Sequence, residues 1–204
     1  MTEETTMRKL PTTKRGKERV NKILDAAAEL IVEMGYADIT TNHIADRADT
    51  SVGSLYQYFK NKDTVLEALA DRYLEQLHAV LDEGFKAVAA QMSLPDVVAY
   101  FLEGTLKFYT MYPGFEPLFF GAVKTESLEA IGHTAYTDMV TMMQAVLQQH
   151  LPQRPPDELQ PMAHAVISLC KLQLPHRHNL PPELRDAYVK QVTAMARAYV
   201  VTLA

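Results

Sequence analysis

The chain has 204 residues, 48% of them hydrophobic and 22% charged, and a net charge of −5, which is typical of a globular protein with its own core. A single cysteine, Cys170, excludes a disulfide framework within the chain, and no cysteines and histidines have zinc-ligand spacing, so we expect neither a metal nor a cofactor. No signal peptide and no run of roughly 20 uncharged apolar residues is evident, which favours a soluble cytoplasmic protein without a membrane partner.

The negative net charge conceals an uneven distribution of charge along the chain. Between Arg8 and Lys22 there are seven basic residues and one acid, Glu18, whereas residues 63–204 carry ten basic and sixteen acidic residues. The N-terminal end is therefore the end that suits a phosphate backbone, and residues 1–16 are predicted to form a flexible basic arm. A solvated, disordered tail would explain the same charges.

Helical periodicity dominates the first eighty residues. Apolar residues three and four positions apart predict three helices, with Gly35 as the C-cap of the first and Thr40 as the N-cap of the second. A long amphipathic helix is then predicted to begin near Lys62. The three predicted helices span about residues 17–34, 41–48 and 52–59, with a short connection over 36–39.

Beyond Gly84 the sequence stays helical in pattern, with prolines as boundaries and no strand pattern. Further helices are predicted over residues 96–111, 127–151, 157–174 and 183–203, with a loop over 175–182. The sequence thus predicts an all-α protein in which an N-terminal three-helix domain over residues 17–62 precedes a helical bundle over residues 63–204.

Two short helices joined by a tight turn and braced by a third can present a helix to the major groove of DNA. In the stretch 51–62, Leu55 and Phe59 fall on the inward side and are expected to anchor it. The outward side offers a methyl-contacting side chain, a close backbone approach, a hydroxyl donor and an amide that can pair with adenine. These predicted base-reading residues are Val52, Gly53, Ser54 and Gln57.

Polar residues around this stretch are placed to bind phosphates. Tyr56 and Tyr58 offer hydroxyl groups at its rim, and Thr41 lies at the amino end of the second helix, where backbone N–H groups also suit phosphate oxygens. Lys60 and Lys62 lie where the next helix begins, a position at which a cation opposes the helix dipole but suits a phosphate. This conflict with the dipole indicates a functional position.

Four stretches of the N-terminal region read K-I-L-D-A-A-A-E-L, G-Y, T-T-N-H-I-A-D-R-A and S-V-G-S-L-Y-Q-Y-F-K-N-K-D. Together they resemble the DNA-binding domain of TetR-type regulators, nearly without gaps, over about residues 17–74. The resemblance implies base or groove contacts for Asn42, Val52, Gly53, Ser54 and Tyr56, and phosphate contacts for Thr41, Tyr58 and Lys62. Asp49 and Thr50 stand where the family frequently has glycine and valine, which bears on the angle between the helices and leaves the base preference open.

The resemblance also implies that residues 63–204 hold a small-molecule effector and form a homodimer through the last two helices. Aromatic residues and methionines in the middle of the chain suit a largely apolar ligand, although ordinary core packing explains them equally. The predicted ligand-binding residues are Phe101, Phe108, Tyr112, Phe119, Tyr136, Met139 and Met143. His133, His164 and His176 could donate to a ligand, and Cys170 is expected to be a buried core thiol.

The apolar faces of the last two predicted helices can pair across a twofold axis, or they can complete the core of a single chain. A twofold dimer would present two recognition helices to double-stranded DNA, which predicts a palindromic operator. The predicted function is therefore a sequence-specific transcriptional repressor that a small, largely apolar ligand releases from its operator. An activator, and a helical interaction module without DNA binding, are the alternatives, and no catalytic motif favours an enzyme.

Overall fold

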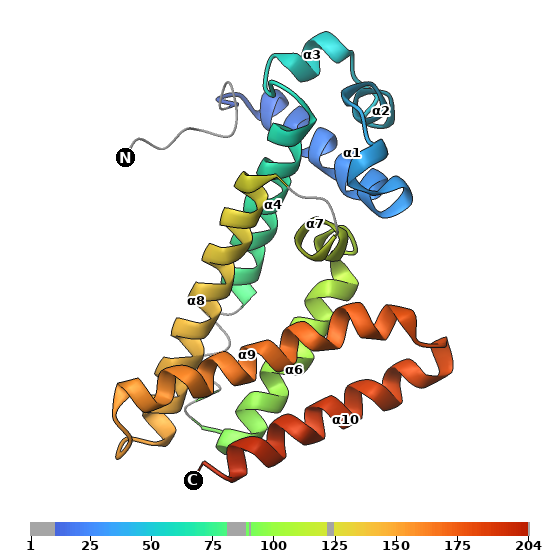
Figure 1. The fold of residues 1–204 in the computed structure, drawn as a ribbon. Coiled ribbons are helices and arrows are strands. Elements are labelled where there is room, and N and C mark those ends of the chain that lie inside the picture. The colour runs from blue at the N-terminus through green and yellow to red at the C-terminus, as the bar shows by residue number, and fades with distance from the viewer. Residues whose placement is uncertain (1–10, 81–88, 90, 122–124, 204) are drawn as a thin grey trace. The chain divides into compact units, whose positions relative to one another are not determined.

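A computed structural model describes residues 11–80, 89, 91–121 and 125–203, and this part of the chain consists of helices and connecting turns without a strand (Figure 1). The predicted all-α fold with an N-terminal helix-turn-helix is confirmed. Most of the predicted basic arm, including Arg8 and Lys9, lies outside the described residues. The helices are α1 (Lys14–Asp38), α2 (Thr41–Arg47), α3 (Val52–Tyr56), α4 (Lys62–Val80), α6 (Leu94–Met111), α7 (Phe115–Phe120), α8 (Glu126–His150), α9 (Pro156–Asn179) and α10 (Pro182–Val201).

Helix α1 is longer at both ends than its apolar pattern predicts. It begins at Lys14 because the Thr13 side chain caps it, accepting a hydrogen bond from the Gly16 amide at 3.1 Å. Gly35, predicted to be the C-cap, instead interrupts the helix, with a φ of 76° that favours glycine. One further helical turn then follows to Asp38, so the predicted connection over residues 36–39 is wrong except at Ile39.

Helix α2 is capped by Thr40, as predicted, since the amide of His43 donates to the Thr40 hydroxyl at 3.2 Å. Helix α3 begins after its own cap, Ser51, but ends at Tyr56 rather than at residue 59. Beyond Tyr56 the hydrogen-bond pattern changes, because the Tyr58 amide donates to the Leu55 carbonyl three residues back at 3.0 Å. The amide of Lys60 then donates to the Thr64 hydroxyl at 3.1 Å.

The described residues form two compact units. The first contains the residues up to Glu75 together with Tyr112–Gly132, and the second contains Gln76–Met111 and the residues from His133 onwards. Helices α4 and α8 therefore each contribute to both units. These units describe packing, and the functional division predicted at residue 62 stays a prediction.

The first unit has its core between α1, α2, α3 and the first part of α4. Its largest fully buried side chains belong to these helices, to the turns between them and to α7 (Phe115–Phe120): Ile23, Ile31, Ile39, Ile44, Leu55, Phe59, Leu66, Leu69 and Leu118. Helix α7 packs against α1 in the same unit. Gly114, just before α7, permits a close approach, because a Cβ there would lie 3.0 Å from the Ala28 carbonyl oxygen.

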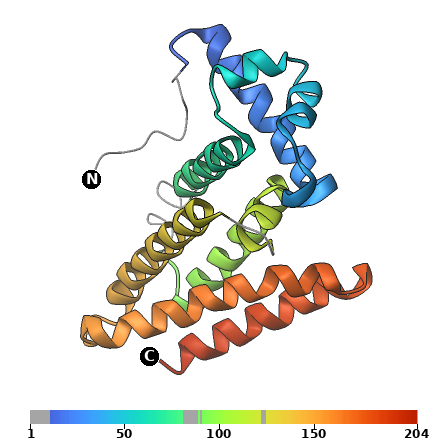
Figure 2. The same cartoon turned by 45° about the horizontal axis from the view of Figure 1, so that its top comes forward.

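In the second unit, α10 packs against both α6 and α9, and α9 and α10 lie side by side (Figures 1 and 2). Helix α9 continues through Pro175 to Asn179, so the loop predicted over residues 175–182 is wrong apart from Leu180 and Pro181. A proline within a helix removes one hydrogen bond and bends the helix without necessarily ending it. By contrast, Pro156 and Pro182 begin their helices, where the missing N–H costs nothing.

Candidate nucleic-acid interface

Helices α2 and α3 present a polar surface over a buried apolar support. Leu55 and Phe59 have no exposed surface, which confirms that they anchor the recognition stretch. Several of the predicted base-reading or phosphate-binding side chains are exposed, and the others are half-buried. The exposed ones are Asn42, Gly53, Tyr56 and Gln57, and the half-buried ones are Thr41, Val52, Ser54, Tyr58 and Lys62.

Three hydrogen bonds orient the side chains on this surface. The hydroxyl groups of Thr41 and Tyr56 lie 3.2 Å apart, which links the start of α2 to the end of α3. Ser51 Oγ accepts from the Ser54 amide at 3.1 Å and donates to Ser54 Oγ at 2.9 Å. Since the Ser54 hydroxyl accepts this bond, its own proton remains available for an acceptor on a base edge.

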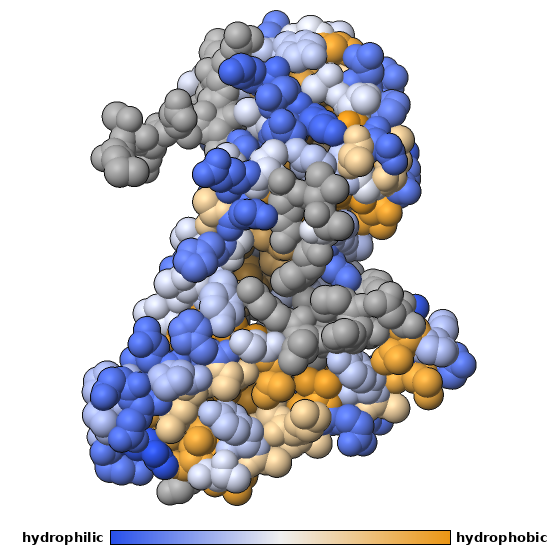
Figure 3. Space-filling model, in the orientation of Figure 1, coloured by the Kyte–Doolittle hydropathy of each residue, from blue (hydrophilic) through white to orange (hydrophobic). Residues whose placement is uncertain are grey.

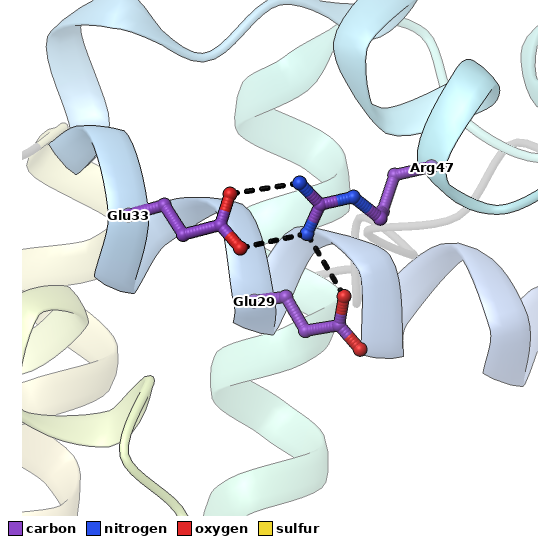
Figure 4. Close-up of polar contacts among 3 residues, drawn as sticks. All are labelled: Glu29, Glu33 and Arg47. Atoms are coloured by element: carbon purple, nitrogen blue, oxygen red, sulfur yellow. Dashed lines mark hydrogen bonds and ion pairs between the residues drawn. The ribbon is translucent and has the colours of Figure 1, made fainter.

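Arg47, at the end of α2, binds two carboxylates of α1 (Figure 4). Its Nη1 and Nη2 atoms donate to the two oxygens of Glu33 at 2.9 Å and 2.7 Å, and Nη1 also lies 2.9 Å from Glu29 Oε2. The hydrogen bond from Arg47 holds the pKa of the Glu33 carboxyl below its ordinary value of 4.5. This clamp fixes α2 on α1, and sequence reasoning missed it because spaced charges on exposed helix faces usually indicate only solvated surface.

Lys62 and Tyr36 join the start of α4 to the last turn of α1. Lys62 Nζ donates to the carbonyl oxygens of Tyr36 at 2.9 Å and Ala37 at 3.2 Å, and it lies 4.8 Å from the centroid of the Tyr36 ring. The Tyr36 hydroxyl donates to Asp63 Oδ1 at 2.6 Å. Burial, followed by this bond to Asp63, raises the pKa of Tyr36 above its ordinary value. The phosphate contact predicted for Lys62 stays a prediction.

The start of α1 is basic and exposed. Lys14, Arg15, Lys17 and Lys22 carry exposed side chains there. The Tyr58 hydroxyl lies close to this end of α1, since a Cβ on Gly16 would be 3.3 Å from it. The predicted rim tyrosine and the described part of the basic segment therefore lie near one another in the first unit.

The structure does not bring the predicted ligand-binding residues into one unit. Phe101, Phe108 and Met143 are buried in the second unit, which also holds the half-buried Tyr136 and Met139. Tyr112 and Phe119 belong instead to the first unit. There they are part of an aromatic cluster in which Tyr73 lies 5.6 Å from Tyr112 and 5.9 Å from Phe115, and Phe115 lies 4.3 Å from Phe119, between ring centroids.

Among the histidines singled out in the sequence, His164 has a defined partner. Its Nδ1 atom lies 2.9 Å from the Tyr136 hydroxyl, and the two rings are 5.5 Å apart. His133 is exposed, and the side chains of Cys170 and His176 lie outside the described residues. Within the described ranges, no three or more His, Cys, Asp and Glu side chains are arranged to hold a metal ion, and no helix is long and apolar enough to cross a membrane.

Comparison with known families decides what this helix-turn-helix belongs to. A model of "Bacterial regulatory proteins, tetR family" matches residues 23–69, and a model of the "Tetracyclin repressor-like, C-terminal domain" matches residues 92–204, more than half of the chain. The chain belongs to the TetR family. The TetR family consists of transcriptional regulators and not of enzymes.

Relatives within the TetR family match the N-terminal region in sequence and most of the chain in fold. The repressor KstR of Mycolicibacterium smegmatis is 36% identical over 66 residues, 32% of this chain and 32% of that protein. The chain thus matches about a third of the length of its curated relatives. A TetR-family regulator from Streptomyces coelicolor is 25% identical with a TM-score of 0.64, covering 91% of this chain and 99% of its own. FadR of Bacillus subtilis, solved with stearoyl-CoA, is 16% identical with a TM-score of 0.63, covering 85% and 97%.

Proposed function

We propose that this TetR-family protein is a homodimeric repressor that binds a palindromic operator and is released from it by a small, largely apolar ligand. The observation that carries the DNA-binding part is the surface of α2 and α3, where polar side chains stand over the fully buried Leu55 and Phe59. A buried support fixes the direction of the exposed side chains, which is what reading of base edges requires. The basic start of α1 adds phosphate contacts that do not depend on base sequence.

The polar surface divides between bases and phosphates. We assign base or groove contacts to the exposed or half-buried side chains along α3 and to Asn42 of α2, and phosphate contacts to Thr41 and Tyr58. The Thr41 to Tyr56 hydrogen bond supports this assignment because it holds the two helices at a fixed separation. The residues of the α3 surface are Val52, Gly53, Ser54, Tyr56 and Gln57.

The exposed apolar side chains of α10 support a homodimer. Leu184, Met195 and Val201 are 49%, 60% and 60% exposed, although each is large and apolar. Apolar side chains gather over the region of α10 in the space-filling view (Figure 3). Exposed apolar surface favours association, and a twofold pairing through α9 and α10 would place two copies of α3 for two half-sites.

Aromatic and methionine residues of the second unit support an apolar effector. Phe101, Phe108, Tyr136, Met139 and Met143 provide polarizable apolar surface together with one hydroxyl group. The same fold binds an acyl ligand in FadR, which was solved with stearoyl-CoA. Release requires that the ligand favours an arrangement of the dimer that fits the operator less well, and coupling of about 1–3 kcal/mol would change operator affinity roughly 5- to 150-fold. We propose that α4 transmits the effect of the ligand to the DNA-binding helices, because this helix contributes residues to both units.

Selection of bound duplexes from a random DNA library, with the full chain at physiological salt, tests the DNA-binding part. We expect a palindromic consensus whose half-sites are about one helical turn, or a small multiple of it, apart. Enrichment of a single asymmetric site would contradict the dimer, and no enrichment would contradict sequence-specific reading by the ligand-free protein. Fatty acyl compounds added to the bound complex then test release.

An activator is the second candidate, since repression depends on where the operator lies. A reporter gene with the selected site placed across its promoter separates the two roles. Expression that falls when the protein is present supports the repressor, whereas expression that rises only with the site placed upstream supports the activator.

A further inference from the structure

The ammonium group of Lys62 lies against the carboxyl end of α1, although the residue itself belongs to the amino end of α4. Lys62 is the first residue of α4, where a cation opposes the helix dipole. Its Nζ atom, however, binds the carbonyl oxygens of Tyr36 and Ala37, which belong to the last turn of α1. Carbonyl groups in a last turn lack partners within their own helix and carry the negative end of the dipole, so a cation is favourable there.

Two further contacts hold the same junction together. The Lys62 ammonium lies over the Tyr36 ring at 4.8 Å, and the hydroxyl of that ring donates to Asp63 at 2.6 Å. Two consecutive residues of α4 thus bind one residue of α1, through its ring, its hydroxyl and its carbonyl group. The turn they bind follows Gly35, whose φ of 76° breaks the helix and sets the direction of that last turn.

This junction connects both ends of the DNA-reading pair of helices. On one side, the last turn of α1 leads within three residues into α2, which begins at Thr41. On the other side, the exit from α3 is tied to the start of α4, because the amides of Lys60 and Asn61 donate to Thr64 Oγ1 and the amide of Thr64 donates to Asn61 Oδ1 at 2.9 Å. A contact that holds the start of α4 against the end of α1 therefore also fixes the position of the carboxyl end of α3 and of the amino end of α2.

We infer that Lys62 is a positioning residue of the DNA-binding unit: its ammonium holds the start of α4 against the last turn of α1, and it serves operator recognition through this contact rather than as a phosphate ligand. The inference rests on the proposed DNA-binding function. A phosphate ligand would contribute equally to all DNA sequences and to the salt dependence of binding. A positioning residue contributes to the fold and to the discrimination between sequences.

The test compares three full-length variants with the wild type. Lys62→Met keeps the length of the side chain but removes its charge and donors, Lys62→Arg keeps both, and Lys60→Met removes a charge from an exposed position two residues earlier as the control. Thermal unfolding is measured without DNA. Affinity is measured for the selected duplex and for a scrambled duplex of the same composition, over a series of salt concentrations.

For Lys62→Met we expect a lower Tm, at least a tenfold loss of affinity for the selected duplex, a smaller loss for the scrambled duplex, and an unchanged slope of log affinity against log salt. Lys62→Arg should recover most of both losses, and Lys60→Met should leave the Tm unchanged. A Tm equal to that of the wild type, with a slope smaller by about 0.9, would show one lost phosphate contact and would overturn the inference.

Two results would prevent the main comparison, and each is interpreted in its own way. If the wild type binds no duplex, the proposed function fails, and the Tm comparison still decides whether Lys62 holds the junction. If Lys62→Met does not fold, Tyr36→Leu removes the ring beneath the ammonium without removing a charge. Tyr36→Leu should then reduce affinity for the selected duplex more than for the scrambled one, and equal losses on the two duplexes would overturn the inference.

Discussion

Asp49 lies in the turn between α2 and α3 with a φ of 49°, in the left-handed region that non-glycine residues rarely adopt. It is the one such residue among those the structure describes. The TetR resemblance places Asp49 where the family frequently has glycine, and the residue adopts a left-handed conformation that glycine takes readily. Aspartate tolerates this region better than most residues because its short polar side chain can bond to nearby backbone.

Replacing Asp49 tests how much strain the turn retains. Asp49→Gly should raise the free energy of unfolding by roughly 0.5 to 1 kcal/mol, because glycine relieves a steric cost larger than the entropy it adds to the unfolded chain. Asp49→Ala should lower it by a similar amount, since alanine has the Cβ atom without the polar group. Denaturant unfolding of the three proteins measures both changes, and a glycine variant less stable than the wild type would contradict the argument.

At the scale of elements, the ends of the helices depend on local hydrogen bonds that apolar periodicity reports only in part. Thr40 is read directly from the sequence and caps α2 as predicted. Gly35, predicted as a C-cap, only interrupts α1, whose C-cap is Ile39. After the early end of α3, the Lys60 amide bonds to the hydroxyl of Thr64, which lies five residues beyond the predicted end of that helix. Helix α9 continues through Pro175, a residue at which the sequence predicted a loop.

The Arg47 clamp between α1 and α2 makes stability depend on pH and salt. The pKa of Glu33 is lowered in the folded chain, so its contribution is present above pH 4.5, the ordinary value, and is lost as the pH falls through the lower folded value. Glu33→Gln should therefore lower the Tm at neutral pH and low salt. The difference from the wild type should shrink in about 1 M salt, which screens exposed charges, and below the folded pKa of Glu33.

The matched control is Glu129→Gln, because Glu129 is an exposed glutamate of α8 that is far from α1 in sequence. The Tm of Glu129→Gln should stay close to the Tm of the wild type across the same conditions. If Glu33→Gln and Glu129→Gln behave alike at neutral pH and low salt, the clamp does not contribute to the stability of the first unit.

At the scale of the whole molecule, the fold class and the DNA-binding helices follow from sequence, whereas the composition of the two packing units does not. The sequence groups Tyr112 and Phe119 with Phe101 and Phe108, because all four are aromatic residues at helical spacing. The structure places the first pair in the unit that contains α1 and the second pair in the other unit. Periodicity identifies which residues are buried but not which helices they are buried against.

The proposed dimer predicts a specific effect of charge on α10. Met195→Glu should raise the dissociation constant of the dimer at least roughly tenfold, because the twofold axis would bury two like charges in one apolar interface. Lys190→Glu also adds negative charge to α10 but lies about 140° around the helix, and it should have a much smaller effect. Sedimentation velocity over a concentration series measures both, and equal dimer strength in Met195→Glu and the wild type would place the interface elsewhere.

The measurement that most directly tests DNA reading by α3 is the selection from a random library, repeated with Gln57→Ala. Gln57 is exposed at the end of α3, and a side-chain amide is able to pair with adenine. We predict that the variant selects the same palindrome with the same half-site spacing, but with preference lost at one symmetry-related position in each half-site. An unchanged consensus would contradict base reading by Gln57, and a different half-site spacing would contradict the assignment of α3 as the recognition helix.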